Sequence, residues 1–204
     1  MRDETIAEFL AKLAARTPAP GGGAAAALHA AQAAALIAMV ARYTDGPRHD
    51  TALVGRVRAA ADGLIDEALG LAEADAEAFG QVAAAYRLPK ETDAEKEMRS
   101  QAISDALAGA ARPPADLMAA SARLAGLTEE LLPAANRNVI SDLAAAAAAI
   151  TAAAVTARVN IEANLGGLRD QRLADELAET AALAGEVADR AARLIDAVRE
   201  EMSS

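Results

Sequence analysis

The sequence contains a turn whose backbone could bind a ligand, placed directly before a long helix. Pro20, the second of two closely spaced prolines, is followed by Gly21, Gly22 and Gly23 and then by an uncharged stretch over residues 24–41. Glycines allow close approach and left-handed backbone, and the first N–H groups of a helix lack intrahelical partners. A ligand oxygen or ring could therefore reach this helix N-terminus. An ordinary helix cap is the alternative interpretation.

Asp75 is the second residue that could do chemistry. It stands at an apolar position in a pattern of steps of four and three residues that runs through residues 57–82, the spacing of a packed helical seam. An unpaired buried carboxylate is costly, so Asp75 must be hydrogen-bonded, paired or turned to a cavity. Burial raises the pKa of a carboxyl group and suits it to act as a base. A structural aspartate, tied to a helix end or to an arginine, is the alternative.

Two amides, Asn160 and Asn164, are spaced one helical turn apart and could contact the same edge of a ligand, although such pairs also join helices. Asp142 falls on the same helical face as Asn160 but about 27 Å away along a straight helix. We therefore expect these residues to bind opposite ends of a long ligand or to belong to sites of different subunits.

The elements that must position these residues are helices. The chain of 204 residues is rich in alanine, has only 2% aromatic residues and lacks period-two β-branched runs. We predict one all-α domain over residues 1–204, a helical bundle with long antiparallel helices, two of them buried and Ala-rich. The expected helices span residues 3–16, 23–43, 50–86, 93–112, 114–126, 139–164 and 171–202. Because helices that are apolar all round cannot face water, we also expect a homodimer.

Composition excludes several classes of protein. The net charge of −10 argues against a nucleic-acid partner, because binding to phosphates needs clustered cations. No cysteine is present and only His29 and His49 offer imidazole, so we expect no metal site. The N-terminus shows no signal-peptide pattern, and the uncharged stretch 24–41 is mostly alanine. We therefore expect a cytoplasmic protein without a membrane partner.

Five segments in the same order resemble the cyclodeaminase/cyclohydrolase family, which comprises the C-terminal domain of formiminotransferase-cyclodeaminase and the free-standing methenyltetrahydrofolate cyclohydrolases. They are residues 18–24 (PAPGGGA), 75–79 (DAEAF), 88–96 (LPKETDAEK), 136–142 (NRNVISD) and 159–164 (VNIEAN). Each motif alone is weak, but together they cover essentially the whole chain.

The resemblance implies an enzyme of folate one-carbon metabolism. The reaction would be hydrolysis of methenyltetrahydrofolate to formyltetrahydrofolate, with the tetrahydrofolate derivative as substrate and no cofactor. Because no formiminotransferase domain is seen, we prefer the cyclohydrolase; a formiminotetrahydrofolate cyclodeaminase and a non-catalytic folate-binding or interaction module are the alternatives. The residues implied are catalytic Asp75 and Lys90, and substrate-binding Pro20, Gly21, Gly22, Gly23, Arg48, Asn136, Asp142, Asn160 and Asn164.

Two of these assignments have alternatives. Lys90 lies in a Pro-Lys motif that the resemblance places near the site, but a solvated loop cation has the same pattern. Many relatives carry a lysine run where this chain has residues 44–50 (TDGPRHD). Arg48 keeps a positive charge there, so we expect it to bind the anionic tail of the substrate. Lys90, Arg99 and Arg112 are further candidates for a local basic patch.

Overall fold

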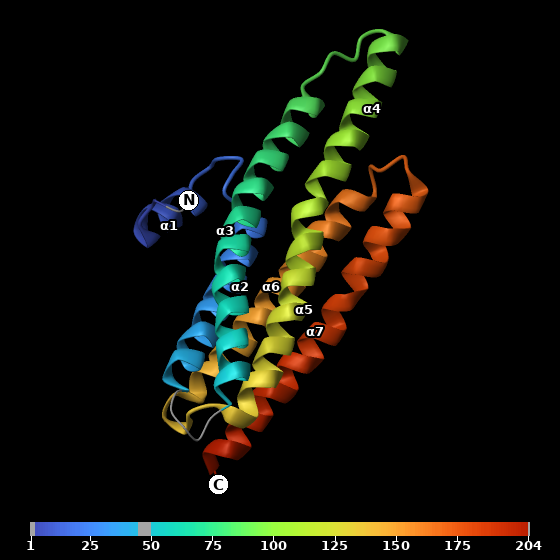
Figure 1. Cartoon of the computed structure of the whole chain (residues 1–204). Coiled ribbons are helices and arrows are strands. Elements are labelled where there is room, and N and C mark those ends of the chain that lie inside the picture. Colours follow the sequence, from blue (N-terminus) through green and yellow to red (C-terminus); the bar gives the residue numbers. More distant parts are fainter. Residues whose placement is uncertain (1–2, 45–49, 204) are drawn as a thin grey trace.

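Long helices form a bundle in the computed structural model, which describes residues 3–44 and 50–203 (Figure 1). In these ranges no strand occurs, which confirms the predicted all-α fold. The α-helices are α1 (Ile6–Leu13), α2 (Gly22–Tyr43), α3 (Thr51–Tyr86), α4 (Asp93–Ala110), α5 (Arg112–Leu131), α6 (Ser141–Leu165) and α7 (Gln171–Ser203). Two short 3₁₀ turns, Leu132–Ala134 and Arg137–Val139, join α5 to α6.

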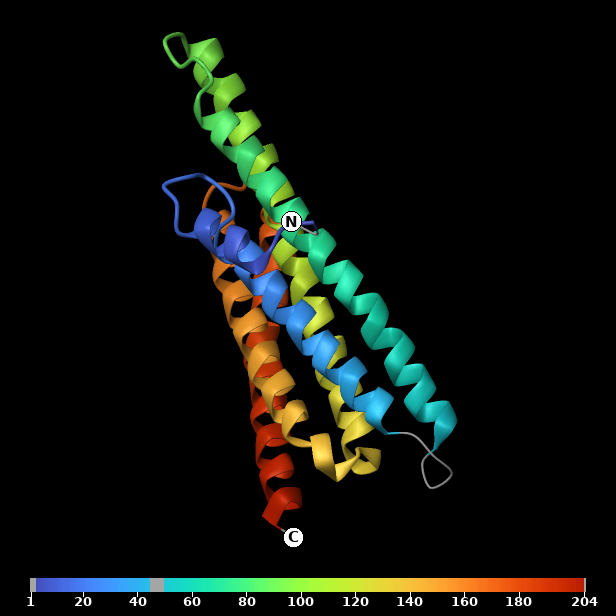
Figure 2. The same cartoon turned by 90° about the vertical axis from the view of Figure 1, so that its left-hand side faces the viewer.

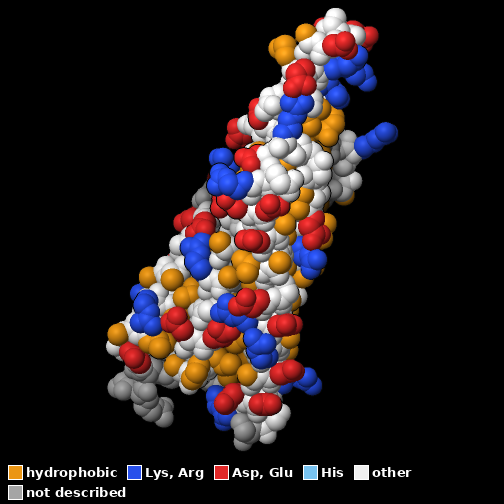
Figure 3. All heavy atoms as spheres, turned by 90° about the vertical axis from the view of Figure 1, so that its right-hand side faces the viewer, with side chains coloured by type: hydrophobic (Ala, Val, Ile, Leu, Met, Phe, Trp, Pro, Cys, Tyr) orange, Lys and Arg blue, Asp and Glu red, His pale blue; other side chains and the backbone are white. Residues whose placement is uncertain are grey.

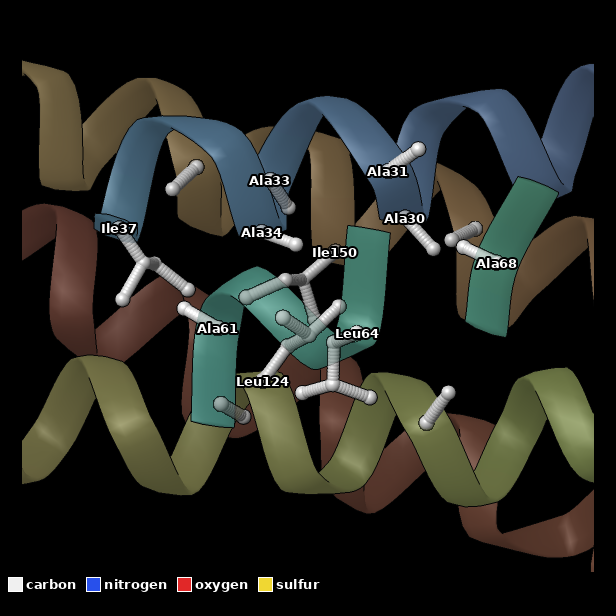
Figure 4. Close-up of a cluster of buried hydrophobic side chains, with 14 of the residues drawn as sticks. Ala30, Ala31, Ala33, Ala34, Ile37, Ala61, Leu64, Ala68, Leu124 and Ile150 are labelled. Carbon is white, nitrogen blue, oxygen red and sulfur yellow. The ribbon is translucent and has the colours of Figure 1, made fainter. Parts of the chain in front are cut away.

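The core is built from small side chains between closely packed helices. Alanines of α2 meet the apolar seam of α3 and branched residues from α5 and α6 (Figure 4). The side chains drawn and labelled there include Ala30, Ala34 and Ile37 of α2, Leu64 of α3 and Ile150 of α6. Because alanine adds little bulk, neighbouring backbones approach closely, and burial of each helix face supplies most of its stability.

The α3–α4 hairpin extends beyond the other helices as an arm (Figures 1 and 2). Helix α3 has 36 residues whereas its neighbour α2 has 22, so the C-terminal part of α3 extends beyond the bundle. A capping box between Thr92 and Glu95 starts α4, as the sequence predicts. We call residues 76–104 the arm.

Two helices, α1 and α5, differ from the prediction at both ends. Helix α1 is shorter than expected, because the Thr5–Glu8 capping box starts it at Ile6 and it ends at Leu13. Helix α5 starts before Pro113 and Pro114, because prolines are tolerated in the first turn, where backbone N–H groups have no intrahelical partner. The same helix continues to Leu131, through residues expected to be irregular.

Helices α2 and α6 are the two Ala-rich helices that the sequence predicts. By length and composition each could cross a membrane, a property that core helices of bundles share. They lie side by side, on the face that Figure 2 turns to the viewer. Their outer faces expose apolar side chains, since Val155 and Val159 of α6 and Tyr43 of α2 are about half exposed, next to the exposed pair of Arg158 and Glu162.

Candidate functional site

A cavity of about 210 Å³ opens where the Gly-rich turn, the middle of α3 and the C-terminal part of α6 meet. The start of α2 forms one wall, and the base of the arm forms another. The lining residues are Pro18, Ala19, Gly21, Gly22, Gly23, Asp75, Phe79, Val82, Ala110, Asn160, Ala163 and Asn164. The cavity therefore combines one carboxyl group and two amides with apolar walls.

Asp75 is tied to the N-terminus of α2 across the two helices. Its carboxylate accepts a hydrogen bond from the backbone N–H of Ala24, one of the donors that the helix itself cannot satisfy. Burial raises the pKa of Asp75 above its ordinary value, and the bond from Ala24 opposes that rise. The carboxyl group is thus both a structural cap and a group whose pKa is raised above its ordinary value.

Gly23 makes this contact possible because it has no side chain. A Cβ atom at this position would overlap all three atoms of the Asp75 carboxylate. Gly22 has room for one, since the nearest atoms, Thr156 Cγ2 and Asn160 Oδ1, would lie 3.9 and 4.0 Å away. Gly21 is the N-cap residue, with φ of −135°, and the space beside it is open.

The glycines are needed for the close approach of a neighbouring helix and not for unusual backbone angles. None of Gly21, Gly22 and Gly23 has φ in the left-handed region. The conformational freedom expected from the sequence is therefore not used. Position 23 needs glycine because another helix presses a carboxylate against it.

Asn160 and Asn164 project from α6 into the same cavity. The Asn164 side chain donates from Nδ2 to the Asn160 carbonyl oxygen at 2.7 Å, so this amide holds the local backbone. The Asn160 Nδ2 group is buried and has no hydrogen-bond acceptor among the described residues. A buried unpaired donor is costly, so this amide favours a ligand acceptor.

Lys90 does not line this cavity. It is exposed in the loop at the tip of the arm, fifteen residues beyond Asp75, whereas the cavity lies at the base of the arm. The geometry therefore does not place Lys90 close enough to Asp75 of the same chain to act with it in catalysis. Pro20 lies between the lining residues Ala19 and Gly21.

Asn136 and Asp142 lie at the opposite end of the bundle. The Asn136 side chain donates from Nδ2 to the carbonyl oxygen of Tyr43 at 2.8 Å, and its backbone N–H donates to Thr44 Oγ1 at 3.1 Å. These bonds tie the α5–α6 connection to the end of α2 that is remote from Gly22. Asp142 is in the first turn of an uninterrupted α6, about 27 Å from Asn160 by helical rise.

The structure therefore brings together the Gly-rich turn, Asp75, Asn160 and Asn164, and leaves Lys90, Asn136 and Asp142 outside their cavity. Arg48 lies outside the described residues. Sequence reasoning missed the apolar walls, Phe79, Val82, Ala110 and Ala163. A signal for two of them existed, because Phe79 and Val82 follow Asp75 by four and seven residues and so share its helical face.

The cavity can perform acid–base chemistry on a bound ring. It offers one carboxyl group with a raised pKa, an amide donor without an acceptor among the described residues, and apolar walls. Among the described residues no cluster of three His, Cys, Asp or Glu could hold a metal ion.

Comparisons with known proteins point to one family. The sequence profile described as formiminotransferase-cyclodeaminase matches residues 5–183. A methenyltetrahydrofolate cyclohydrolase of Methylorubrum extorquens is 35% identical over 98% of this chain and 99% of its own length. A formimidoyltransferase-cyclodeaminase of Rattus norvegicus is 33% identical over 82% of this chain, which covers 32% of that longer protein. The solved structure of a formiminotetrahydrofolate cyclodeaminase of Thermotoga maritima is 27% identical, with a TM-score of 0.82 over 99% of this chain and 97% of its own.

Proposed function

Because the chain belongs to the formiminotransferase-cyclodeaminase family, we propose that it hydrolyses methenyltetrahydrofolate to formyltetrahydrofolate in the cavity around Asp75. The observation that carries the proposal is the Asp75 carboxyl group, which burial holds at a raised pKa beside the unpaired amide donor of Asn160. The likeness to the Methylorubrum extorquens cyclohydrolase over nearly its whole length supports this choice of reaction.

The residues divide the chemistry between them. The bridging carbon of the substrate is already electrophilic, so the protein must hold the ring and activate water. Ionised Asp75 takes a proton from water as its oxygen bonds to that carbon, and the proton then assists departure of the ring nitrogen. Asn160 Nδ2 is placed to donate a hydrogen bond to an acceptor on the bound ring or on the intermediate.

A spectrophotometric assay tests this proposal. We expect purified protein to accelerate the loss of methenyltetrahydrofolate absorbance above the rate in buffer alone, with formyltetrahydrofolate as the product. Since the base must be ionised, kcat/KM should fall as pH decreases through the raised pKa of Asp75. An unchanged rate in the presence of protein would exclude the reaction.

Cyclodeamination of formiminotetrahydrofolate is the second candidate, favoured by the likeness to the Thermotoga maritima protein. Here the substrate's own nitrogen attacks the formimino carbon and ammonia departs, so protonated Asp75 would act as the acid. The raised pKa of Asp75 serves this role as well. The two reactions differ in pH dependence. As pH rises, hydrolysis gains the ionised base Asp75, whereas cyclodeamination loses the protonated acid Asp75. Ammonia release measured on formiminotetrahydrofolate distinguishes them directly.

The proposed enzyme is a homodimer. The outer faces of α2 and α6 expose apolar side chains, and the exposed side of α1 adds Ile6 and Leu10. The face over α7 differs, because acidic and basic side chains are interspersed among its hydrophobic ones (Figure 3). Exposed apolar side chains on neighbouring helices are typical of an interface, so a second copy is the proposed occupant.

A further inference from the structure

The cavity continues outward along the arm on α3. Phe79 and Val82 line the cavity, and Tyr86 follows them at helical spacing, eleven residues after Asp75. Positions separated by four, seven and eleven residues fall on one side of an α-helix. The cavity face of α3 therefore leads from the carboxyl group of Asp75 past two apolar side chains to the ring of Tyr86.

Helix α4 continues the same side of the arm. Ala110 lines the cavity, and Ile103 and Arg99 precede it by seven and eleven residues. The two rows meet at their outer ends. The Arg99 guanidinium lies over the Tyr86 ring, 5.5 Å from its centroid, and donates from Nε and Nη2 to the Tyr86 carbonyl oxygen at 3.3 and 3.1 Å.

Arg99 has no carboxylate partner among the described residues. Within residues 3–44 and 50–203, nine other arginines form ion pairs with Asp or Glu, at positions 42, 56, 123, 137, 158, 169, 172, 190 and 199. Arg87 and Lys90, in the same part of the arm, are likewise without an ion-pair partner in the described ranges, and Glu91 is the acid that lies between Lys90 and α4. In a chain of net charge −10, cations without carboxylate partners along the arm that leads out from the cavity favour an anionic ligand.

We infer that the arm binds the anionic end of the substrate, with Arg99 as the specificity-determining residue and Lys90 as its outer partner. The inference rests on the proposed function, because it assigns the tail of a folate whose ring occupies the cavity. From Asp75 to Tyr86 the helix rises about 16 Å, a span suited to an extended ligand. An aromatic amide would pack on Phe79 and Val82, and the first carboxylates would reach the Nη1 edge of Arg99.

The order of residues along the arm makes the inference specific. Arg99 is nearer to the cavity and should contact the first glutamate of a folate tail. Lys90 is at the tip and should contact only additional glutamates. This assigns Lys90 to binding of a long tail, in place of the catalytic role that the sequence motif suggests.

The test compares ligands with and without a tail. Isothermal titration calorimetry would measure the binding of 5-formyltetrahydropteroate, which has no glutamate, and of 5-formyltetrahydrofolate with one and with three glutamates. The variants are Arg99→Gln and Lys90→Gln. Arg58→Gln is the matched control, because Arg58 is an exposed arginine on α3 without an ion-pair partner in the part of the chain that the structure describes, about 25 Å from Asp75 by helical rise.

We expect Arg99→Gln to weaken binding of the one-glutamate ligand about fivefold, the effect of one partly exposed charge pair, and to leave the pteroate unchanged. Lys90→Gln should weaken only the three-glutamate ligand, and both effects should shrink at high salt. Equal losses for pteroate and folate, or no loss for any ligand, would overturn the inference while the ring site stands. If the unmodified protein binds none of the ligands, the proposed function fails and the inference fails with it.

Discussion

Asp75 stands between two influences on its pKa, and these connect its structural and chemical roles. Burial disfavours the ionised form, whereas the N–H of Ala24 favours it. The two interpretations left open by the sequence, a capping aspartate and a catalytic base, are therefore compatible. One side chain closes the N-terminus of α2 and presents a carboxyl group to the cavity.

Asp75→Asn should separate these roles. The amide oxygen can still accept from Ala24, but the base is lost, so kcat should fall about 100-fold or more with little change in folate affinity. Because the pKa of Asp75 is raised in the folded state, the wild-type protein loses stability as pH rises through that pKa. The variant should therefore be the more stable protein at neutral pH, by on the order of 0.5–1 kcal/mol, with the difference vanishing in acid. Steady-state kinetics measure the change in kcat, and melting curves across pH measure the change in stability. An undiminished kcat would leave Asp75 with the capping role alone.

The three glycines predict a graded response to alanine. Gly23→Ala forces a Cβ atom into the Asp75 carboxylate and should cost about 1–3 kcal/mol of unfolding free energy together with most activity. Gly21→Ala and Gly22→Ala are matched controls with room for the methyl group, and both should fold nearly as well as the wild type. Urea titration ranks the three proteins. The double variant Gly23→Ala with Asp75→Ala should recover stability without activity, and equal stability of all three single variants would refute the packing argument.

At this scale the sequence predicts some residues better than others. Asp75 is found because it interrupts an apolar pattern along its own helix. The need for Gly23 is invisible, since the clash comes from a helix some fifty residues away. Phe79 and Val82 resemble core residues, because an apolar side chain has the same helical spacing whether it faces a core or a cavity. The distance between Asn160 and Asp142 follows from helical rise alone.

The arm is joined to the α6–α7 loop by one side chain. Arg169, in the α6–α7 loop, donates to Glu97 at 2.6 and 3.1 Å, to Ser100 at 2.8 Å and to Gln101 at 3.2 Å. Its backbone N–H also donates to Ser104 Oγ at 3.0 Å. The overhang of the arm is predictable, since the helix expected over residues 50–86 is far longer than its neighbour. The contacts of Arg169 that brace the arm are not predictable, because the α6–α7 loop and the arm are distant in sequence.

Arg169→Ala should loosen the arm without unfolding the bundle. Hydrogen exchange of amides in the first turns of α4 should accelerate, while amides of α2 and α6 keep their protection, because exposed pairs add little to global stability. Hydrogen bonding to Arg169 lowers the pKa of Glu97, so the brace should weaken as pH falls through that lowered value. Arg172→Ala, which removes only a pair within α7, is the control. Unchanged exchange in α4 would mean that packing alone holds the arm.

For the whole molecule, the contrast between its faces bears on assembly. The exposed apolar side chains of α2 and α6 lie on the two Ala-rich helices that the sequence predicts to be buried. The other helices of the bundle cover only the inner sides of α2 and α6. The sides that point away from these helices stay open to solvent. Which flank stays open depends on how the helices pack, and the sequence alone does not give that.

A charge on the open flank should therefore separate the proposed dimer. Val155→Glu places a carboxylate on the outer face of α6. Because Val155 is 46% exposed, the glutamate should leave the bundle core intact. Burying this unpaired charge against a second copy would cost several kcal/mol, so the variant should sediment as a monomer at micromolar concentration while the unmodified protein sediments as a dimer. Leu183→Glu is the matched control, since Leu183 is also 46% exposed but lies on α7, outside the proposed interface. Analytical ultracentrifugation of the three proteins, with circular dichroism to verify that each is folded, gives the result. If the unmodified protein and both variants all sediment as monomers, the exposed flank of α2 and α6 does not pair two copies.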